Sequence, residues 1–301
     1  ILRIGIFSLI ILIVIAVVLP LYTLLSKSME DMDGKFIGLQ NFIEYFETPA
    51  LFSSIANSLT VAISVALIVL VIAFVYGYAL TRTRMPLRWL FRGIALIPIL
   101  APSLLAAISL IYWFGNQGVL RSWLGDGSIY GPIGIIMGSC FWVFPHALMI
   151  IVTALSTADA RLYEAAEALR TPKWRVFFTV TLPGAKYGIL SAGFIVFTLV
   201  ITDFGVPKVI GGRYNVLATD VYKQVVGQQN FEMGAVVSLI LLLPAVIAFI
   251  ADRWVQRRQI ALLSPHAVPF QPKDHPLRDG ILFVFCLIVS IILISMLAMA
   301  V

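Results

Sequence analysis

The chain has 301 residues, of which 60% are hydrophobic and 12% are charged, and its formal net charge at pH 7 is +6. Soluble domains carry about 25% charged residues, and the mean hydropathy here is +1.00. This composition excludes a water-soluble fold and predicts a protein whose solvent is lipid.

Seven apolar stretches are each about as long as a helix that crosses the hydrocarbon core, which needs about 20 residues. They predict an all-α, polytopic membrane protein. Both ends of the chain fall inside apolar stretches, so we expect it to be part of a longer protein. In chain order the stretches are Ile4–Leu25, Ser58–Leu80, Gly93–Phe114, Pro132–Leu155, Tyr187–Val206, Gly234–Ala251 and a last one from Gly280 to the end.

The lysines and arginines are divided unequally between the two sides of this predicted arrangement. Of the 21, 15 lie before the first stretch or in the even-numbered connections, and six lie in the odd-numbered ones. Connections rich in Lys and Arg stay in the cytoplasm. The even-numbered connections and the N-terminus are therefore predicted to be cytoplasmic.

The first outer connection, Ser26–Asn57, contains an amphipathic run at Gly38–Phe42 that continues to Tyr45-Phe46. This pattern predicts a short helix at the outer membrane interface. An ordinary solvated loop is the alternative.

The cysteines and histidines give no sign of a metal site or a disulfide framework. Cys140 and Cys286 both lie in apolar runs, and His146, His266 and His275 are scattered. We expect no metal ion and no cofactor.

The fourth connection, Ser156–Lys186, reads as two short helices. Asp159 is placed to cap a helix over Ala160–Leu169. Thr171 can cap the second helix, with Pro172 at its first position, and Leu182-Pro183-Gly184 is expected to end it.

Both helices of this connection carry an apolar face, and Glu164 and Glu167 flank the first of them. An exposed apolar patch on such a loop indicates a protein partner, and a helix that docks in a groove is a common mode of binding. The residues of the two faces are Leu162, Ala165, Ala166 and Leu169, followed by Trp174, Phe177 and Phe178.

The same connection resembles the EAA loop of binding-protein-dependent ABC importer permeases. The run Tyr163–Leu169 reads YEAAEAL, and Trp174-Arg175 and Thr181-Leu182-Pro183 follow at matching spacing. The family has a Gly where this chain has Arg170. This departure puts in doubt the tight turn that the Gly permits, although Thr171-Pro172 supplies a break of its own.

The resemblance implies a mechanism and a set of partners. The loop would dock as a coupling helix in a cytoplasmic ATPase dimer, whose closure on ATP would rock the membrane helices and give alternating access. Further partners would be an extracytoplasmic substrate-binding protein and a second permease half, fused or separate, in a bacterial inner membrane. The residues that would couple to the ATPase are Glu164, Ala165, Ala166, Leu169 and Arg170.

Glu164 also has an alternative role in this loop. It could form a surface ion pair with Arg161 or Arg170, which would stabilise the fold by less than about 1 kcal/mol. The chain also has no GxxxxGK[ST] phosphate loop, so we expect ATP hydrolysis on a partner chain and a transport role, not an enzymatic one, here.

The last stretch resembles a restart of the chain. Leu277–Ile281 matches Leu2–Ile6 at four of five positions, after a polar segment with prolines. We therefore expect a first permease domain over 1–263, a cytoplasmic linker over 264–279 and the first span of a second repeat over 280–301. A plain seventh helix is the alternative.

The fused layout is similar to permeases of the ferric iron and phosphonate branch. Ile201–Gly212 and the segment from Asn215 to Lys223 resemble permeases assigned to 2-aminoethylphosphonate uptake. That compound is the expected substrate, and ferric iron is the alternative.

Asp203 and His146 are candidates for lining the pathway, because ionisable groups within spans are often functional. For Asp203 the alternative is a helix-end carboxylate satisfied by Lys208 or by the backbone after it. For His146 it is a satisfied interior histidine.

Proteins of other classes would show other features. An ion-driven secondary transporter would carry several charges within its spans, where this sequence has almost none beyond Asp203. A membrane-embedded enzyme would need a metal cluster or a nucleophile with its base. A receptor or assembly scaffold would not need the EAA spacing.

Overall fold

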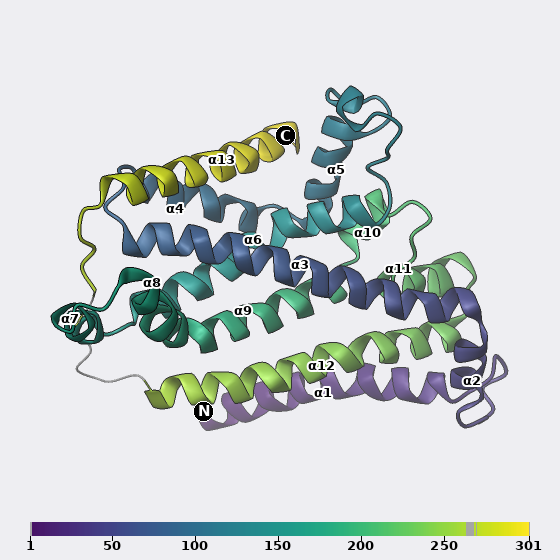
Figure 1. The fold of residues 1–301 in the computed structure, drawn as a ribbon. Coiled ribbons are helices and arrows are strands. Elements are labelled where there is room, and N and C mark those ends of the chain that lie inside the picture. The colour runs from purple at the N-terminus through teal and green to yellow at the C-terminus, as the bar shows by residue number, and fades with distance from the viewer. Residues whose placement is uncertain (1, 263–267, 269, 301) are drawn as a thin grey trace. The chain divides into compact units, whose positions relative to one another are not determined.

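The computed structural model describes residues 2–262, 268 and 270–300. The regular elements in these ranges are helices (Figure 1). Six of them are long and apolar enough to cross a membrane, or seven if one bent pair counts as a single span. The predicted all-α membrane fold is thereby confirmed.

The α-helices have the following bounds: α1 Leu2–Ser28, α2 Gln40–Glu47, α3 Pro49–Arg82, α4 Arg88–Leu96, α5 Ser103–Phe114, α6 Pro132–Ser156, α7 Ala160–Ala168, α8 Lys173–Val176, α9 Leu182–Ile201, α10 Gly205–Ile210, α11 Leu217–Tyr222, α12 Phe231–Leu262 and α13 Pro276–Ala300. Two 3₁₀ segments, η1 Ile97–Leu100 and η2 Arg121–Leu124, and two π segments, η3 Phe177–Thr181 and η4 Lys223–Gly227, complete the set.

The chain forms two compact units. The first comprises Ile1–Ser58 and Asn215–Pro244, and the second comprises Leu59–Tyr214 and Ala245–Val301. Each unit therefore draws on two separate stretches of sequence.

The first unit has a small apolar core around α2. Tyr45 of α2 is fully buried against Leu217 of α11 and against Val236 and Val237 of α12. The predicted short helix after Gly38 is thus present, and its aromatic face packs inward.

A buried polar network accompanies this core. The Ser54 hydroxyl donates to the carboxylate of Asp220, and the Ser58 hydroxyl accepts from the Leu217 amide at 2.8 Å. Burial raises the pKa of Asp220, and the hydrogen bond from Ser54 opposes this shift. Burial also raises the pKa of Tyr45 to about 12. Polar side chains in this unit therefore hold α3 and α11 together.

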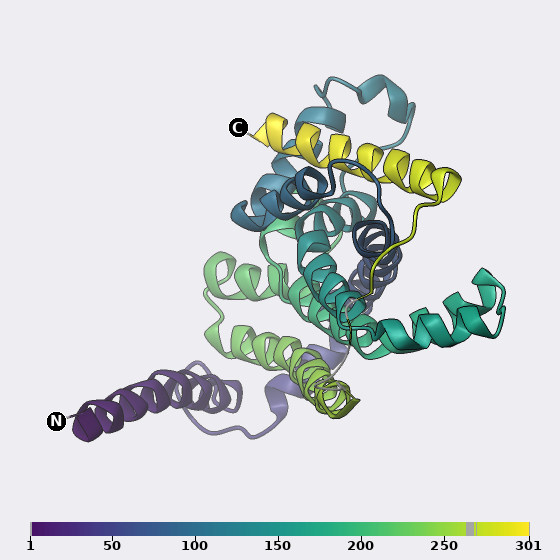
Figure 2. The same ribbon diagram turned by 90° about the vertical axis from the view of Figure 1, so that its left-hand side faces the viewer.

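The second unit is built on close packing between α6 and α9. A Cβ atom on Gly188 of α9 would lie 2.2 Å from the Cβ of Ala154 on α6, so only glycine fits at this contact. Small residues let membrane helices approach in this way. In the same unit α13 packs on α4 and α5, as both ribbon views show (Figures 1 and 2).

The predicted third span is not one continuous helix. It is divided into α4 with η1 and α5, which are bent by 104° at a short break. Pro102 lacks an amide hydrogen and holds Ala101 in an extended conformation, with φ −98° and ψ 131°. Proline at this point therefore ends one helix and starts the next.

The predicted fifth span also has different limits. We expected a helix to end at Leu182-Pro183-Gly184. Instead, the helix that begins at Lys173 continues through η3 to Ile201. The π turn directly before Pro183 accommodates a residue that cannot donate its backbone hydrogen bond. At the other end the helix breaks at Ile201, five residues before the predicted end.

Candidate functional site

The first helix of the loop between α6 and α9 begins as the sequence predicts. The Asp159 carboxylate accepts from the Arg161 amide at 3.1 Å, and α7 starts at Ala160. An aspartate in this position satisfies a backbone donor that the helix leaves free.

The turn after α7 forms although the family glycine is replaced. Arg170 has a φ of 51°, which is the left-handed conformation that glycine adopts most readily. The Arg170 amide donates to the Glu167 carbonyl at 2.8 Å, and the Thr171 amide donates to the Ala166 carbonyl at 2.9 Å. These two bonds make a Schellman motif, so Arg170 takes the role of the glycine at a conformational cost.

The second helix of the loop starts one residue later than predicted. Pro172 is its N-cap and Lys173 its first residue, whereas we expected Thr171 as the cap. The Arg175 amide donates to the Pro172 carbonyl at 2.9 Å, which closes the first turn.

The loop has an inner and an outer side. On the inner side Ala166 is buried, and Phe177 packs edge-on against Phe74 and Tyr78 of α3. On the outer side four large apolar side chains are more than half exposed: Leu162 (57%), Leu169 (80%), Trp174 (67%) and Phe178 (60%). We call these four residues the outer patch.

Of the other proposed coupling residues, Glu164 and Ala165 are exposed on α7. In the described part of the chain, no cationic nitrogen lies within 4.0 Å of the Glu164 carboxylate, so neither Arg161 nor Arg170 forms the alternative ion pair. Glu167, by contrast, forms an ion pair with Lys273 at 2.5 Å.

Arg82, at the end of α3, holds the inner side of the loop. It is 3% exposed, and its guanidinium donates to the Leu155 carbonyl at 2.8 Å and to the Tyr163 hydroxyl at 3.3 Å. The guanidinium carbon also lies 5.1 Å from the centroid of the Tyr163 ring and 4.5 Å from that of Phe270. The charge pattern identified Arg82 only as a topology marker, and its distance in sequence from Tyr163 hid this contact.

The described part of the predicted linker lies along the same loop. The Val268 carbonyl accepts from the Ala160 amide at 2.9 Å, and Lys273 contacts Glu167. Arg84 pairs with Asp274 at 3.1 Å. Residues 263–267 and 269, which include His266, lie outside the described residues. The linker and α7 are thus connected at several points.

Asp203 lies where two helix breaks meet. It is 9% exposed, and its carboxylate accepts from the Ser103 hydroxyl at 2.6 Å and from the Val206 amide at 3.0 Å. A longer contact of 3.3 Å comes from the Gly205 amide. Ser103 begins α5 after the bend, and Asp203 follows the end of α9. The carboxylate therefore satisfies the start of α10 and ties it to α5.

His146 lies at a different place in the same unit. It is half-buried on α6, and its ring centroid is 5.9 Å from that of Trp142. Its Nδ1 atom is buried, with no hydrogen-bond partner among the described residues. Among the described residues, no hydrogen bond joins His146 to Asp203. No group of three His, Cys, Asp or Glu side chains in these residues could hold a metal ion.

Asp252 is a further buried carboxylate, and the sequence places it only at the cytoplasmic end of its span. It accepts from the Ser191 hydroxyl at 2.5 Å and from the Gln256 amide at 2.6 Å, which links α12 to α9. Asp252 and Gln256 are four residues apart on one helix, and this spacing was the available signal for a buried polar face.

Comparison with known proteins places these features in context. Residues 74–261 match the family model described as "Binding-protein-dependent transport system inner membrane component". The matched range includes the α7–α8 loop, His146 and Asp203.

Curated relatives are permease proteins of transport systems. The chain is 23% identical over 283 residues to a ferric transport system permease protein of Actinobacillus pleuropneumoniae, covering 90% of this chain and 41% of that protein. It is 26% identical to a molybdenum transport system permease protein of Haemophilus influenzae, covering 68% of this chain and 93% of that protein. The chain thus spans about two fifths of the ferric relative.

Solved structures show the same fold. One chain of a bacterial alginate ABC transporter, in complex with an alginate-bound periplasmic protein, aligns with a TM-score of 0.66 at 17% identity. The alignment covers 89% of this chain and 96% of that one. A chain of an amino acid ABC transporter aligns with a TM-score of 0.55 at 18% identity, covering 73% and 98% of the two chains.

Proposed function

Since the chain belongs to the family of binding-protein-dependent transport system inner membrane components, we propose that it forms half of the transmembrane path of an ATP-driven importer. It couples through residues 156–186 to a separate cytoplasmic ATPase dimer, receives substrate from an extracytoplasmic binding protein and has a cytoplasmic N-terminus. ATP is hydrolysed on the partner chain.

The outer patch and Glu164 carry the coupling part of this proposal. The loop exposes four large apolar side chains, and it also carries a carboxylate, Glu164, that has no cationic partner among the described residues. An apolar surface of this kind is unfavourable in water and is typical of a docking helix. The inner side of the loop is fixed by Arg82, so a force on the outer patch would reach α3 and α6.

A second permease half, fused or separate, supplies the rest of the path in this proposal. We assign 1–263 to the first permease domain, 264–279 to a linker and 280–301 to the first span of a second repeat. One observation supports the division: the chain spans 41% of a ferric relative, which leaves room in such a protein for a second repeat.

2-Aminoethylphosphonate is the proposed substrate. The support is the resemblance of Ile201–Gly212, which contains Asp203, to permeases assigned to that compound. Asp203, and His146 on α6, would line the path. Ferric iron is the second candidate, because two relatives are named as ferric permeases.

The first test is a mild-detergent pull-down of the tagged full-length protein from native membranes, with wild type beside Glu164→Lys. We expect an ATP-binding subunit to co-purify with wild type and to be lost in the variant. Glu44→Lys is the matched control, since Glu44 is an exposed carboxylate on α2, away from the loop in sequence. Retention of the ATPase by Glu164→Lys at normal expression would refute the coupling role.

The substrate is tested separately, by measuring uptake of labelled 2-aminoethylphosphonate and of ferric iron in cells with and without the permease. Loss of only one uptake on deletion identifies the cargo. Loss of neither would exclude both candidates and leave the coupling proposal intact.

A further inference from the structure

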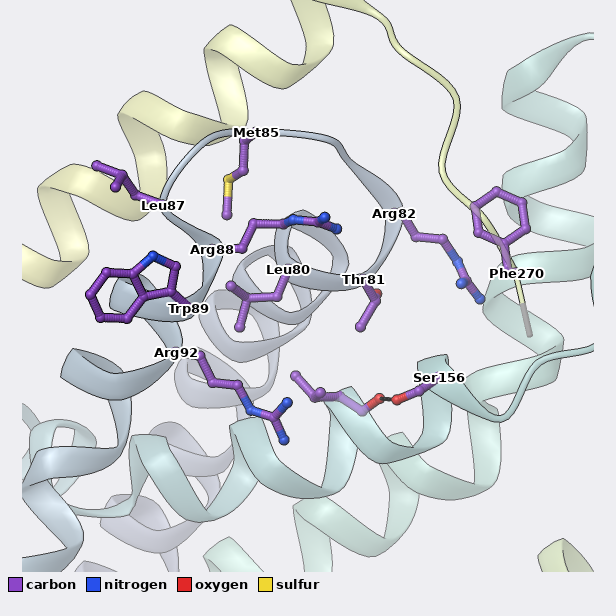
Figure 3. A pocket seen from close by; sticks show the side chains of 11 residues that line it. Leu80, Thr81, Arg82, Met85, Leu87, Arg88, Trp89, Arg92, Ser156 and Phe270 are labelled. Carbon is purple, nitrogen blue, oxygen red and sulfur yellow. Dashed lines mark hydrogen bonds between the residues drawn. The ribbon is translucent and has the colours of Figure 1, made fainter.

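Three arginines surround a cavity of about 700 Å³ at the end of α3 (Figure 3). Arg82 comes from the last turn of α3, and Arg88 and Arg92 come from the first turns of α4. The opposite wall is formed by Val152 and Ser156 of α6. The cavity thus lies between helix ends, and three positively charged side chains line it.

The cavity has no negative charge to balance its arginines. No carboxylate lines it, and none of the described residues places a carboxylate oxygen within 4.0 Å of these three guanidinium groups. In the described part of the chain, the Arg88 side chain donates one hydrogen bond, to the Thr83 carbonyl at 3.0 Å. The three arginines therefore give the cavity lining an excess of positive charge, which a bound anion would neutralise.

The back wall holds an unsatisfied donor. Only 3% of the surface of Arg82 is exposed, and its Nε atom has no hydrogen-bond partner among the described residues. Buried donors are rarely left without an acceptor. Arg82 therefore has capacity to bind a ligand in addition to its bonds to Leu155 and Tyr163.

The rim of the cavity is apolar and exposed. Trp89 is 76% exposed and Leu87 is 48% exposed, and Figure 3 shows both on the α4 side of the arginines. Tryptophan is enriched at membrane interfaces, and basic pockets between membrane helices hold phosphate-bearing lipid headgroups. The rim thus matches the level at which a headgroup would lie.

From these features we infer that the cavity is a binding site for a phosphate-type oxyanion, held by Arg82, Arg88 and Arg92. Guanidinium groups bind such oxygens with paired hydrogen bonds. Two sources share this chemistry: the headgroup of an anionic phospholipid and free phosphate. The site is separate from the outer patch, and its occupation would brace α3 against α4 and α6.

The test uses the full-length permease purified in mild detergent, with Arg88→Gln/Arg92→Gln as the variant. Both arginines are exposed, so the fold should persist, and circular dichroism checks this. Arg92→Gln alone is a second variant, because in the described part of the chain Arg92 makes no ion pair. Arg253→Gln/Arg257→Gln is the control, since it removes the same charge from exposed positions on α12.

Native mass spectrometry and thermal unfolding give the readouts. One arm compares retained phosphatidylglycerol and the unfolding temperature in phosphatidylglycerol and phosphatidylcholine nanodiscs. The other arm titrates sodium phosphate against chloride at equal ionic strength.

We expect the double variant to bind about thirtyfold more weakly than wild type and the control, since each arginine near an anionic headgroup contributes about fivefold. A difference in the lipid arm assigns the site to a headgroup, and a difference in the phosphate arm alone assigns it to a soluble oxyanion. Equal behaviour of wild type, variant and control in both arms would overturn the inference.

Discussion

The carboxylate of Glu164 in the α7–α8 loop and that of Asp203 at its junction have opposite surroundings. Glu164 is exposed, and no cationic partner lies near it in the described part of the chain, whereas Asp203 is buried and accepts from Ser103 and two backbone amides. The sequence singled out both residues as functional candidates. The difference teaches that the loop is arranged for contact with another molecule, while the junction is already internally satisfied.

The largest expected effect is at the junction, in Asp203→Leu. This change leaves the Ser103 hydroxyl and the amides of Gly205 and Val206 without their acceptor, and each buried unsatisfied donor costs about 1–3 kcal/mol. We expect the free energy of unfolding in detergent to fall by about 3 kcal/mol.

Asp203→Asn is the control for this prediction, because its amide oxygen still accepts. A stability of Asp203→Leu equal to that of wild type would show that the junction does not depend on the carboxylate. The comparison with Glu164 would then lose its basis.

A smaller effect is expected for Arg82→Leu, which tests whether the inner side of the loop is fixed. The change removes the bonds to Leu155 and Tyr163 and the stacking on Phe270. Hydrogen bonds from a charged donor contribute about 1.5–3 kcal/mol, so we expect a loss of about 2 kcal/mol.

Hydrogen exchange of the α7 amides measures this locally, and it should accelerate in Arg82→Leu. Arg84→Leu is the control, since it removes an exposed side-chain ion pair with Asp274 and keeps the Arg84 amide that donates to Asp279. Unchanged exchange in Arg82→Leu would mean that the loop is held by its apolar contacts alone.

Arg170→Gly is expected to stabilise the protein slightly. A left-handed conformation costs a non-glycine residue about 1–2 kcal/mol, and the added freedom of glycine in the unfolded chain offsets about 0.4–1 kcal/mol of this. The net gain should be about 0.5 kcal/mol, measured by chemical unfolding. Arg170→Ala keeps the strain and should give no gain, so equal gains in both variants would contradict the explanation.

The smallest effect is expected for Glu167→Gln, which removes the exposed ion pair with Lys273. Such pairs contribute about 0.2–1 kcal/mol, and salt screens them. A double-mutant cycle with Lys273→Gln should give a coupling below about 0.5 kcal/mol that disappears in 1 M salt. A larger coupling that persists in 1 M salt would contradict the description of this contact as a screened surface ion pair.

The sequence predicted most of the helices, because an apolar run of about 20 residues has few other solutions in lipid. It also predicted the cap at Asp159, where a local pattern of a few residues suffices. Two prolines have opposite effects: Pro102 breaks a helix within its span, whereas Pro183, which we expected to end a helix, is accommodated by the π turn η3. Which outcome occurs depends on packing around each proline, which composition does not show.

The contacts of Arg82, Asp203 and Asp252 could not be predicted for a different reason. Each joins residues far apart in the chain, such as Ser103 with Asp203 or Arg82 with Tyr163. A single sequence reveals periodicity along one helix, but it does not show which face of a distant helix lies opposite. The outer patch was easier to anticipate, since its residues lie within one short segment.

The π turn η3 determines how α8 is rotated relative to α9 about the helix axis. A residue in an α-helix rotates the chain by about 100°, so the number of residues in this turn fixes the angular phase between the two helices. Deleting one residue from Phe177–Thr181 would turn Trp174 and everything before it by about that angle about the axis of α9. Such a deletion could leave Leu162, Leu169 and Trp174 in the sequence and still make them face a different direction. Insertions and deletions here should therefore be tolerated far less than substitutions.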